Sequence, residues 1–90
     1  MSPGTCQDEA LSRRALAMLR AAATGRAEMV LSSEPDMFFD GLPCCDQYTA
    51  HLLARRALVA PARPGRVGQR VRALVTSAGM AALESVRDAA

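Results

Sequence analysis

The sequence contains no lysine and no tryptophan, and its only aromatic residues are Phe38, Phe39 and Tyr48. A core must therefore be built from leucine, valine, methionine and many alanines. Because alanine buries little area, and burial stabilises by about 25 cal/mol per Å², a 90-residue domain of this kind has a thin margin of stability. A homodimer or another protein partner would supplement such a core.

Disulfide frameworks, membrane spans and export signals are also missing. Three cysteines, Cys6, Cys44 and Cys45, are an odd number and include an adjacent pair, which suits a reducing cytosol. No stretch approaches the roughly 20 apolar residues of a membrane span, and the start of the chain has no basic region followed by an apolar run. We expect a cytoplasmic protein without membrane contact.

Charge is unevenly distributed along the chain, although the net charge is only +2. Residues 27–54 contain no basic residue other than His51, whereas residues 55–72 contain six arginines and no acid. Arginine is the side chain suited to bidentate contacts with phosphate and guanine. The polarity of the chain therefore favours a nucleic-acid partner over an uncharged one.

The first part of the chain predicts a flexible leader over 1–7 and then one domain over 8–90. A helix is expected from Asp8 to about Ala23, because apolar residues recur there at helical spacing, and Gly25 should end it in a left-handed conformation. The inward stripe of this helix would comprise Leu11, Ala15, Leu16, Leu19, Ala22 and Ala23.

Residues 27–40 allow two interpretations. One is a hairpin that pairs 28–32 with 36–40, and the other is one strand followed by a short helical turn. We favour the strand and short turn.

A second helix is expected over 46–57, with Asp46 as its N-cap. Helical spacing would turn Ala50, Leu53, Ala54, Ala57 and Leu58 inward. The outward face would then carry Tyr48, Leu52, Arg55 and Arg56, with Thr49 and His51 on its flanks.

An antiparallel hairpin should follow this helix. Pro61 restricts the first strand to a sheet edge, and Val71, Ala73 and Val75 alternate with outward residues in the second. Thr76 or Ser77 would cap a last helix, whose Met80, Leu83 and Val86 would face the core.

The segments Leu53-Ala-Arg-Arg-Ala-Leu58-Val59 and Leu74-Val-Thr76-Ser-Ala-Gly79, separated by an arginine-rich loop, resemble bacterial winged helix-turn-helix domains of the multiple-antibiotic-resistance-regulator type. The resemblance covers about residues 45–88. It implies an α+β fold with three main helices, a short antiparallel sheet and a wing hairpin. Two departures stand out: Ala57 occupies the usual glycine position, and residues 28–45 lack a clear helix 2.

The resemblance implies double-stranded DNA as partner and transcriptional regulation, in a bacterium or a phage, as function. A recognition helix (46–57) would enter the major groove, and an arginine-rich wing (61–72) would hold the backbone. By position, the DNA-contacting residues would be Tyr48, Thr49, His51, Arg55, Arg56, Arg63, Arg66, Arg70 and Arg72.

Two further hypotheses come from other classes of protein. A protein-interaction adaptor would dock its partner through Leu52, Phe38, Phe39 and the acidic stretch. A thiol-based redox or metal sensor would use Cys44 and Cys45 with His51, although the paired spacing of structural zinc ligands is missing and small apolar packing is the simpler role. No nucleophile or carboxylate is spaced to work with His51, so we expect neither an enzyme nor a cofactor.

Overall fold

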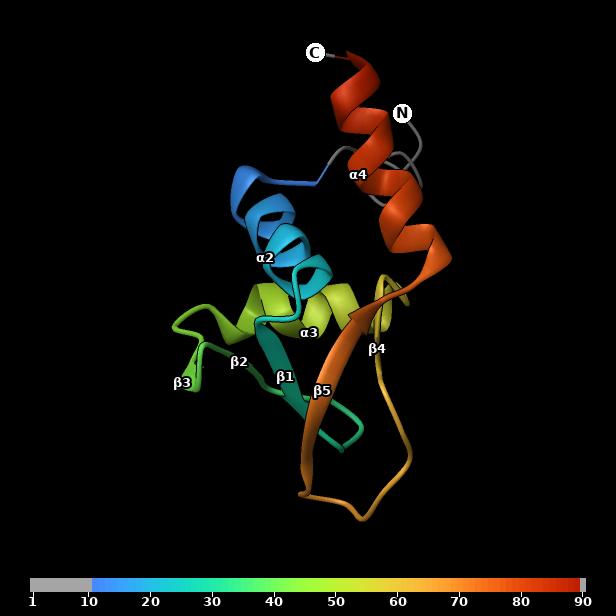
Figure 1. Cartoon of the computed structure of the whole chain (residues 1–90). Coiled ribbons are helices and arrows are strands. Elements are labelled where there is room, and N and C mark those ends of the chain that lie inside the picture. Colours follow the sequence, from blue (N-terminus) through green and yellow to red (C-terminus); the bar gives the residue numbers. More distant parts are fainter. Residues whose placement is uncertain (1–10, 90) are drawn as a thin grey trace, which may run out of the picture.

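The computed structural model of the chain describes the backbone of residues 11–89 and the side chains of residues 11–85. Within this part lie three helices and five strands that form one antiparallel sheet, which confirms the α+β class (Figure 1). The elements are α2 (Arg13–Ala23), β1 (Ala27–Val30), β2 (Met37–Phe39), β3 (Leu42–Pro43), α3 (Gln47–Arg55), β4 (Val59–Pro61), β5 (Arg70–Val75) and α4 (Ser77–Ala89).

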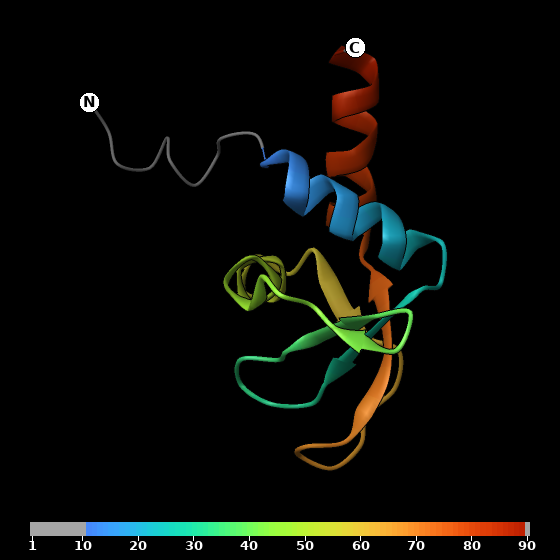
Figure 2. The same cartoon turned by 90° about the vertical axis from the view of Figure 1, so that its left-hand side faces the viewer.

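The sheet has the strand order β3-β2-β1-β5-β4, and one of its faces is covered by helices (Figures 1 and 2). Ala27 and Met29 of β1 and Val71 and Ala73 of β5 point to the covered face and are buried. They form one hydrophobic core with side chains of α2 and α3. The other face of the sheet has no helix over it in the described structure.

Helix α2 begins and ends at local signals. Ser12 is its N-cap, and the hydroxyl of Ser12 accepts a hydrogen bond from the backbone N–H of Ala15 at 3.1 Å. Gly25, at φ +82°, is the expected left-handed stop. The predicted start at Asp8 and the predicted leader over 1–7 lie outside the described residues, but Leu11 and Ser12 are not helical.

The buried side of α2 differs in part from the predicted stripe. Ala15, Leu16, Leu19 and Ala22 are buried as expected, whereas Ala23 is exposed. Met18 and Ala21 are buried in addition. The buried arc is wide because α2 packs against the sheet, α3 and α4 together.

Residues 27–40 form a hairpin, so the favoured prediction of one strand followed by a short helical turn is wrong. β1 pairs with β2 in the register Ala27↔Phe39 and Met29↔Met37. A second hairpin joins β2 to β3 through Asp40 and Gly41, at φ +55° and +84°. Asp-Gly favours the two-residue turn in which both residues have positive φ, and this hairpin takes the place of any second helix before α3.

The pair β4–β5 confirms the expected hairpin. β4 is an edge strand, as Pro61 requires, and in β5 the buried Val71 and Ala73 alternate with exposed residues. All residues from Pro61 to Arg70 are exposed. We call residues 62–69, which join the two strands, the wing loop.

Helix α4 packs differently from its prediction. Thr76 caps it by accepting a hydrogen bond from the N–H of Gly79 at 3.1 Å. Leu83 packs against the core, but Met80 is exposed, so its predicted inward position is wrong. The buried residue in the first turn of α4 is Gly79 instead, because this turn lies against the backbone of Leu58. Val86 lies outside the residues whose side chains are described.

Across residues 11–89, no helix combines the length and the apolar character that crossing a membrane requires.

Candidate nucleic-acid interface

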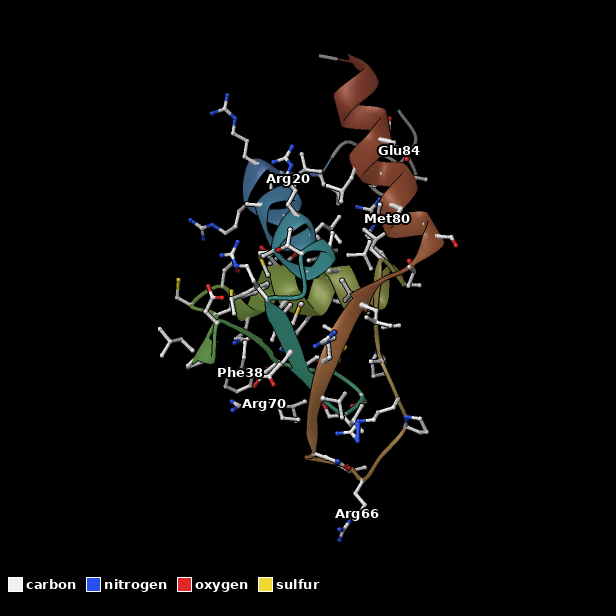
Figure 3. All side chains as sticks on the ribbon, viewed as in Figure 1. Arg20, Phe38, Arg66, Arg70, Met80 and Glu84 are labelled. Carbon is white, nitrogen blue, oxygen red and sulfur yellow. The ribbon has the colours of Figure 1, made fainter. Side chains whose placement is uncertain are left out.

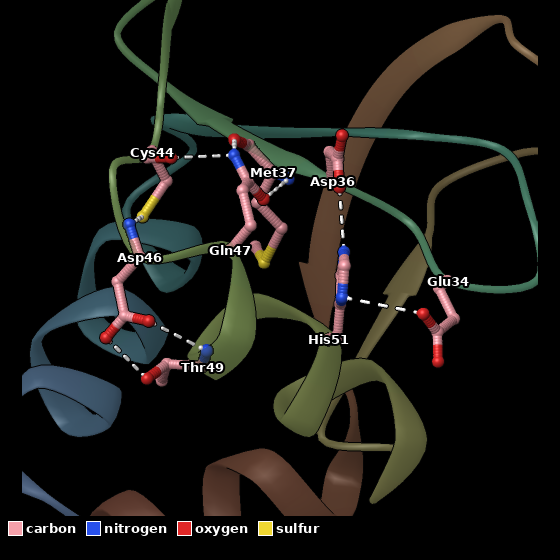
Figure 4. Close-up of polar contacts among 8 residues, drawn as sticks. All are labelled: Glu34, Asp36, Met37, Cys44, Asp46, Gln47, Thr49 and His51. Atoms are coloured by element: carbon pink, nitrogen blue, oxygen red, sulfur yellow. Dashed lines mark hydrogen bonds and ion pairs between the residues drawn. The ribbon is translucent and has the colours of Figure 1, made fainter.

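The N-terminus of α3 is held by Asp46, as predicted. Its carboxylate accepts hydrogen bonds from the backbone N–H of Thr49 at 3.0 Å and from the Thr49 hydroxyl at 2.6 Å (Figure 4). The guanidinium group of Arg14 lies 3.1 Å from the same carboxylate. These bonds from Thr49, with the charge of Arg14, lower the pKa of Asp46 below its ordinary value of 3.8. Thr49, expected on the flank of the outward face, is instead buried and committed to this cap.

The cap makes stability depend on pH. Because the pKa of Asp46 is lowered in the folded state, its contribution is complete above the ordinary value of 3.8 and is lost as pH falls through the folded value. In Asp46→Asn, stability should therefore change less between pH 5 and about pH 2 than in the wild type. Urea unfolding across that range measures the difference, and parallel curves for both proteins would contradict it.

Gln47 ties α3 to the sheet. Its side-chain oxygen accepts from the N–H of Met37 at 2.9 Å, while its amide nitrogen donates to the carbonyls of Met37 at 3.1 Å and Cys44 at 2.7 Å (Figure 4). The amide thus supplies both a donor and an acceptor to the edge of β2. No pattern in the sequence indicated this contact.

Cys44 and Cys45 have different surroundings. Cys44 packs against the core, and its sulfur accepts from the N–H of Asp46 at 3.4 Å, whereas Cys45 is exposed. In the described part of the chain, no group of three or more histidine, cysteine, aspartate or glutamate side chains is arranged to hold a metal ion.

The outward face of α3 largely follows its predicted phase. Ala50 and Leu53 are fully buried, while Tyr48 is 74% exposed, Arg55 is exposed and Leu52 is half-buried. Arg56, at the C-cap, is also half-buried. The outward stripe is thus a phenol, a leucine and guanidinium groups.

Ala57 is an exception to that phase. It was expected to face inward within the helix, but it is exposed and has φ +58°, so the prediction is wrong. Helix α3 ends at Arg55, and the N–H of Leu58 returns to the carbonyl of Leu53 at 2.9 Å. This is the hydrogen bond of a left-handed helix stop, where glycine is the usual residue.

His51 lies between two carboxylates of the loop that joins β1 to β2. Its Nε2 is 2.7 Å from an oxygen of Asp36, and its Nδ1 is 3.8 Å from an oxygen of Glu34 (Figure 4). We call Glu34, Asp36 and His51 the His51 cluster. The prediction that no carboxylate is placed to work with His51 is therefore wrong, because the hairpin β1–β2 brings Glu34 and Asp36 to α3.

The arginines of β5 lie on the uncovered face of the sheet. Arg70 is 3.3 Å from Glu28 and stacks over the ring of Phe38, with 4.4 Å between the guanidinium carbon and the ring centroid (Figure 3). Arg72 alternates in the same direction and is the cross-strand partner of Glu28. Phe39 packs against the core instead, so only Phe38 of the two phenylalanines reaches this face.

The wing loop is exposed along its whole length. Its backbone is bound to Leu31, which accepts from the N–H of Gly68 and donates to the carbonyl of Gln69, both at 2.8 Å. Arg66 lies at the tip (Figure 3), and Val67 beside it is 87% exposed. Neither Arg63 nor Arg66 makes an ion pair with a described residue.

The expected contact residues therefore do not form one continuous basic face. Arg70 and Arg72 belong to the open face of the sheet, whereas α3 lies behind the sheet in Figure 1. On the stripe of α3 and on the wing loop, the exposed residues among the expected contacts are Tyr48, Arg55, Arg63 and Arg66, and Arg56 is half-buried. No protein-family model, curated protein or solved structure matches this chain.

Proposed function

We propose that the protein binds double-stranded DNA and regulates transcription, with α3 in the major groove and the wing loop against the phosphate backbone. The observation that carries this proposal is the wing loop itself, since a hydrogen-bonded backbone presents Arg63 and Arg66 without a described acidic partner. Guanidinium groups held in this way suit phosphate oxygens or the minor groove.

The order of elements supports the same proposal. A helix, an edge strand, an exposed arginine loop, a second strand and a further helix follow one another as the winged-helix resemblance implies. Ala57 adopts a left-handed conformation at the position where that family usually has glycine. The hairpin β2–β3 in front of α3 is a departure, and the proposed fold is therefore a winged helix whose second helix is replaced by two strands.

Fluorescence anisotropy with a labelled random duplex tests the proposal. The wild type should bind at micromolar concentration at low salt, and binding should weaken steeply as salt rises. In Arg63→Ala/Arg66→Ala, affinity should fall about tenfold and the slope of log K against log salt should decrease by about 2, because two phosphate contacts are lost.

Arg13→Ala/Arg20→Ala is the matched control, since it removes the same charge from exposed positions of α2. Arg20 lies on α2, well separated from Arg66 at the tip of the wing loop (Figure 3). Equal losses of affinity in the two double variants would show that only net charge matters, and would reject the wing loop as a DNA contact. The absence of binding at low salt would reject the function.

A protein-interaction adaptor is the second candidate, because Tyr48 and Leu42 are exposed apolar side chains near the start of α3. Such an adaptor would form a defined complex that moderate salt does not dissociate, and heparin would not retain it. DNA binding predicts retention on heparin at moderate salt.

A thiol sensor at Cys44 and Cys45 would require that oxidant or metal changes stability, and replacement of both by serine would abolish that change.

A further inference from the structure

The loop between β1 and β2 brings negative charge to the helix that the proposed function places in DNA. Glu34 and Asp36 belong to this loop, and His51 lies between them from the middle of α3 (Figure 4). On the surface of α3, His51 is three residues after Tyr48 and four before Arg55, so it borders the outward stripe. The His51 cluster is therefore part of the same surface.

The carboxylates are held in place and remain open to solvent. The carbonyl of Asp36 accepts from the N–H of Val30 at 3.0 Å, and Pro35 between the two acids is buried. The Glu34 and Asp36 side chains are 62% and 55% exposed, whereas that of His51 is 23% exposed. A polyanion that approached this part of α3 would meet two carboxylates before it met the imidazole.

We propose that Glu34 and Asp36 are specificity-determining residues of the DNA interface. Asp36 occupies Nε2 of His51, as a phosphate oxygen would, and Glu34 lies 3.8 Å from Nδ1. Both carboxylates repel phosphate from that side of α3. Like charges across an interface suppress unwanted partners more than they alter wanted contacts. The duplex is thereby confined to Arg55, Arg56 and the wing loop, and DNA of arbitrary sequence binds weakly. This inference rests on the proposed function.

The test is Glu34→Gln/Asp36→Asn, which keeps the shape of both side chains and removes two negative charges. Anisotropy with a labelled random duplex should show binding about tenfold tighter than that of the wild type at low salt. The gain should shrink as salt rises, because the repulsion is screened within about 10 Å at 0.1 M.

Asp40→Asn/Glu84→Gln is the matched control, since it removes the same charge from two exposed acids that make no described contact with α3. Its affinity should rise no more than about twofold. Equal gains in the two variants would show an effect of net charge alone and overturn the inference.

Two outcomes separate the inference from the function beneath it. Salt-dependent binding by the wild type without a gain in the double variant would overturn the inference alone. No binding by any of the proteins would overturn both. If the double variant unfolds, Glu34→Gln alone serves as the second variant, because Glu34 makes only the longer contact of 3.8 Å. On a logarithmic scale, its affinity should rise roughly half as much as that of the double variant. No rise in affinity would again reject the proposed role in specificity.

Discussion

Replacing Leu53 with alanine should lower the free energy of unfolding by about 3 kcal/mol, within the range for large-to-small changes in a packed core. Leu53 is 0% exposed and is one of the four largest fully buried side chains. Six of the fifteen buried hydrophobic residues are alanine, so few large side chains fill the core. A surrounding of small side chains cannot easily collapse into the vacated volume. Urea unfolding followed by circular dichroism measures the loss.

Leu52→Ala is the matched control for Leu53→Ala. Leu52 precedes Leu53 in α3 and is half-buried on the outward stripe. The same atoms are removed in both variants. Its replacement should cost less than about 1 kcal/mol. Equal costs for the two variants would mean that α3 is rotated relative to the core, and the stripe proposed for DNA would then be wrong.

Replacing Gly79 with alanine should destabilise the protein by about 2 kcal/mol through overpacking. An ordinary exposed helix position would gain up to about 1 kcal/mol from the same change. At Gly79 a Cβ would collide with the carbonyl oxygen of Leu58 and lie 2.6 Å from Cγ1 of Val75. The carbonyl cannot move away freely, because it accepts a hydrogen bond from the N–H of Thr76 at 3.0 Å.

Ala81→Gly, at an exposed position of the same helix, is the control for backbone propensity. It should cost about 1 kcal/mol, since glycine is a weak helix former. Thermal and urea unfolding of both variants give the comparison. A stabilised Gly79→Ala would show that the first turn of α4 is not seated on Leu58.

Local signals in the sequence were sufficient for several elements. Gly25 ends α2, Asp46 caps α3 and Pro61 restricts β4 to an edge, because each depends on the backbone within a few residues. The alternation in β5 correctly separated its buried from its exposed residues, since period two follows from the pleat alone. The hairpin β2–β3 also has a local signal, because Asp40-Gly41 favours a tight two-residue turn.

Only the tertiary structure decided which charges meet. Arg70 and Arg72 were expected among the DNA contacts of the wing, but they lie on the uncovered face of the sheet, where Glu28 and Phe38 engage Arg70. His51 meets Asp36 from fifteen residues away, and Gln47 meets Met37 from ten. Such contacts depend on the register of β1 with β2 and on the seating of α3, which no local pattern encodes. The sequence by itself determined the boundaries marked by Gly25, Asp46 and Pro61 and the alternation of β5, because these depend only on the neighbouring backbone. Long-range packing determined how residues 27–40 pair and which side chains remain free to bind a partner.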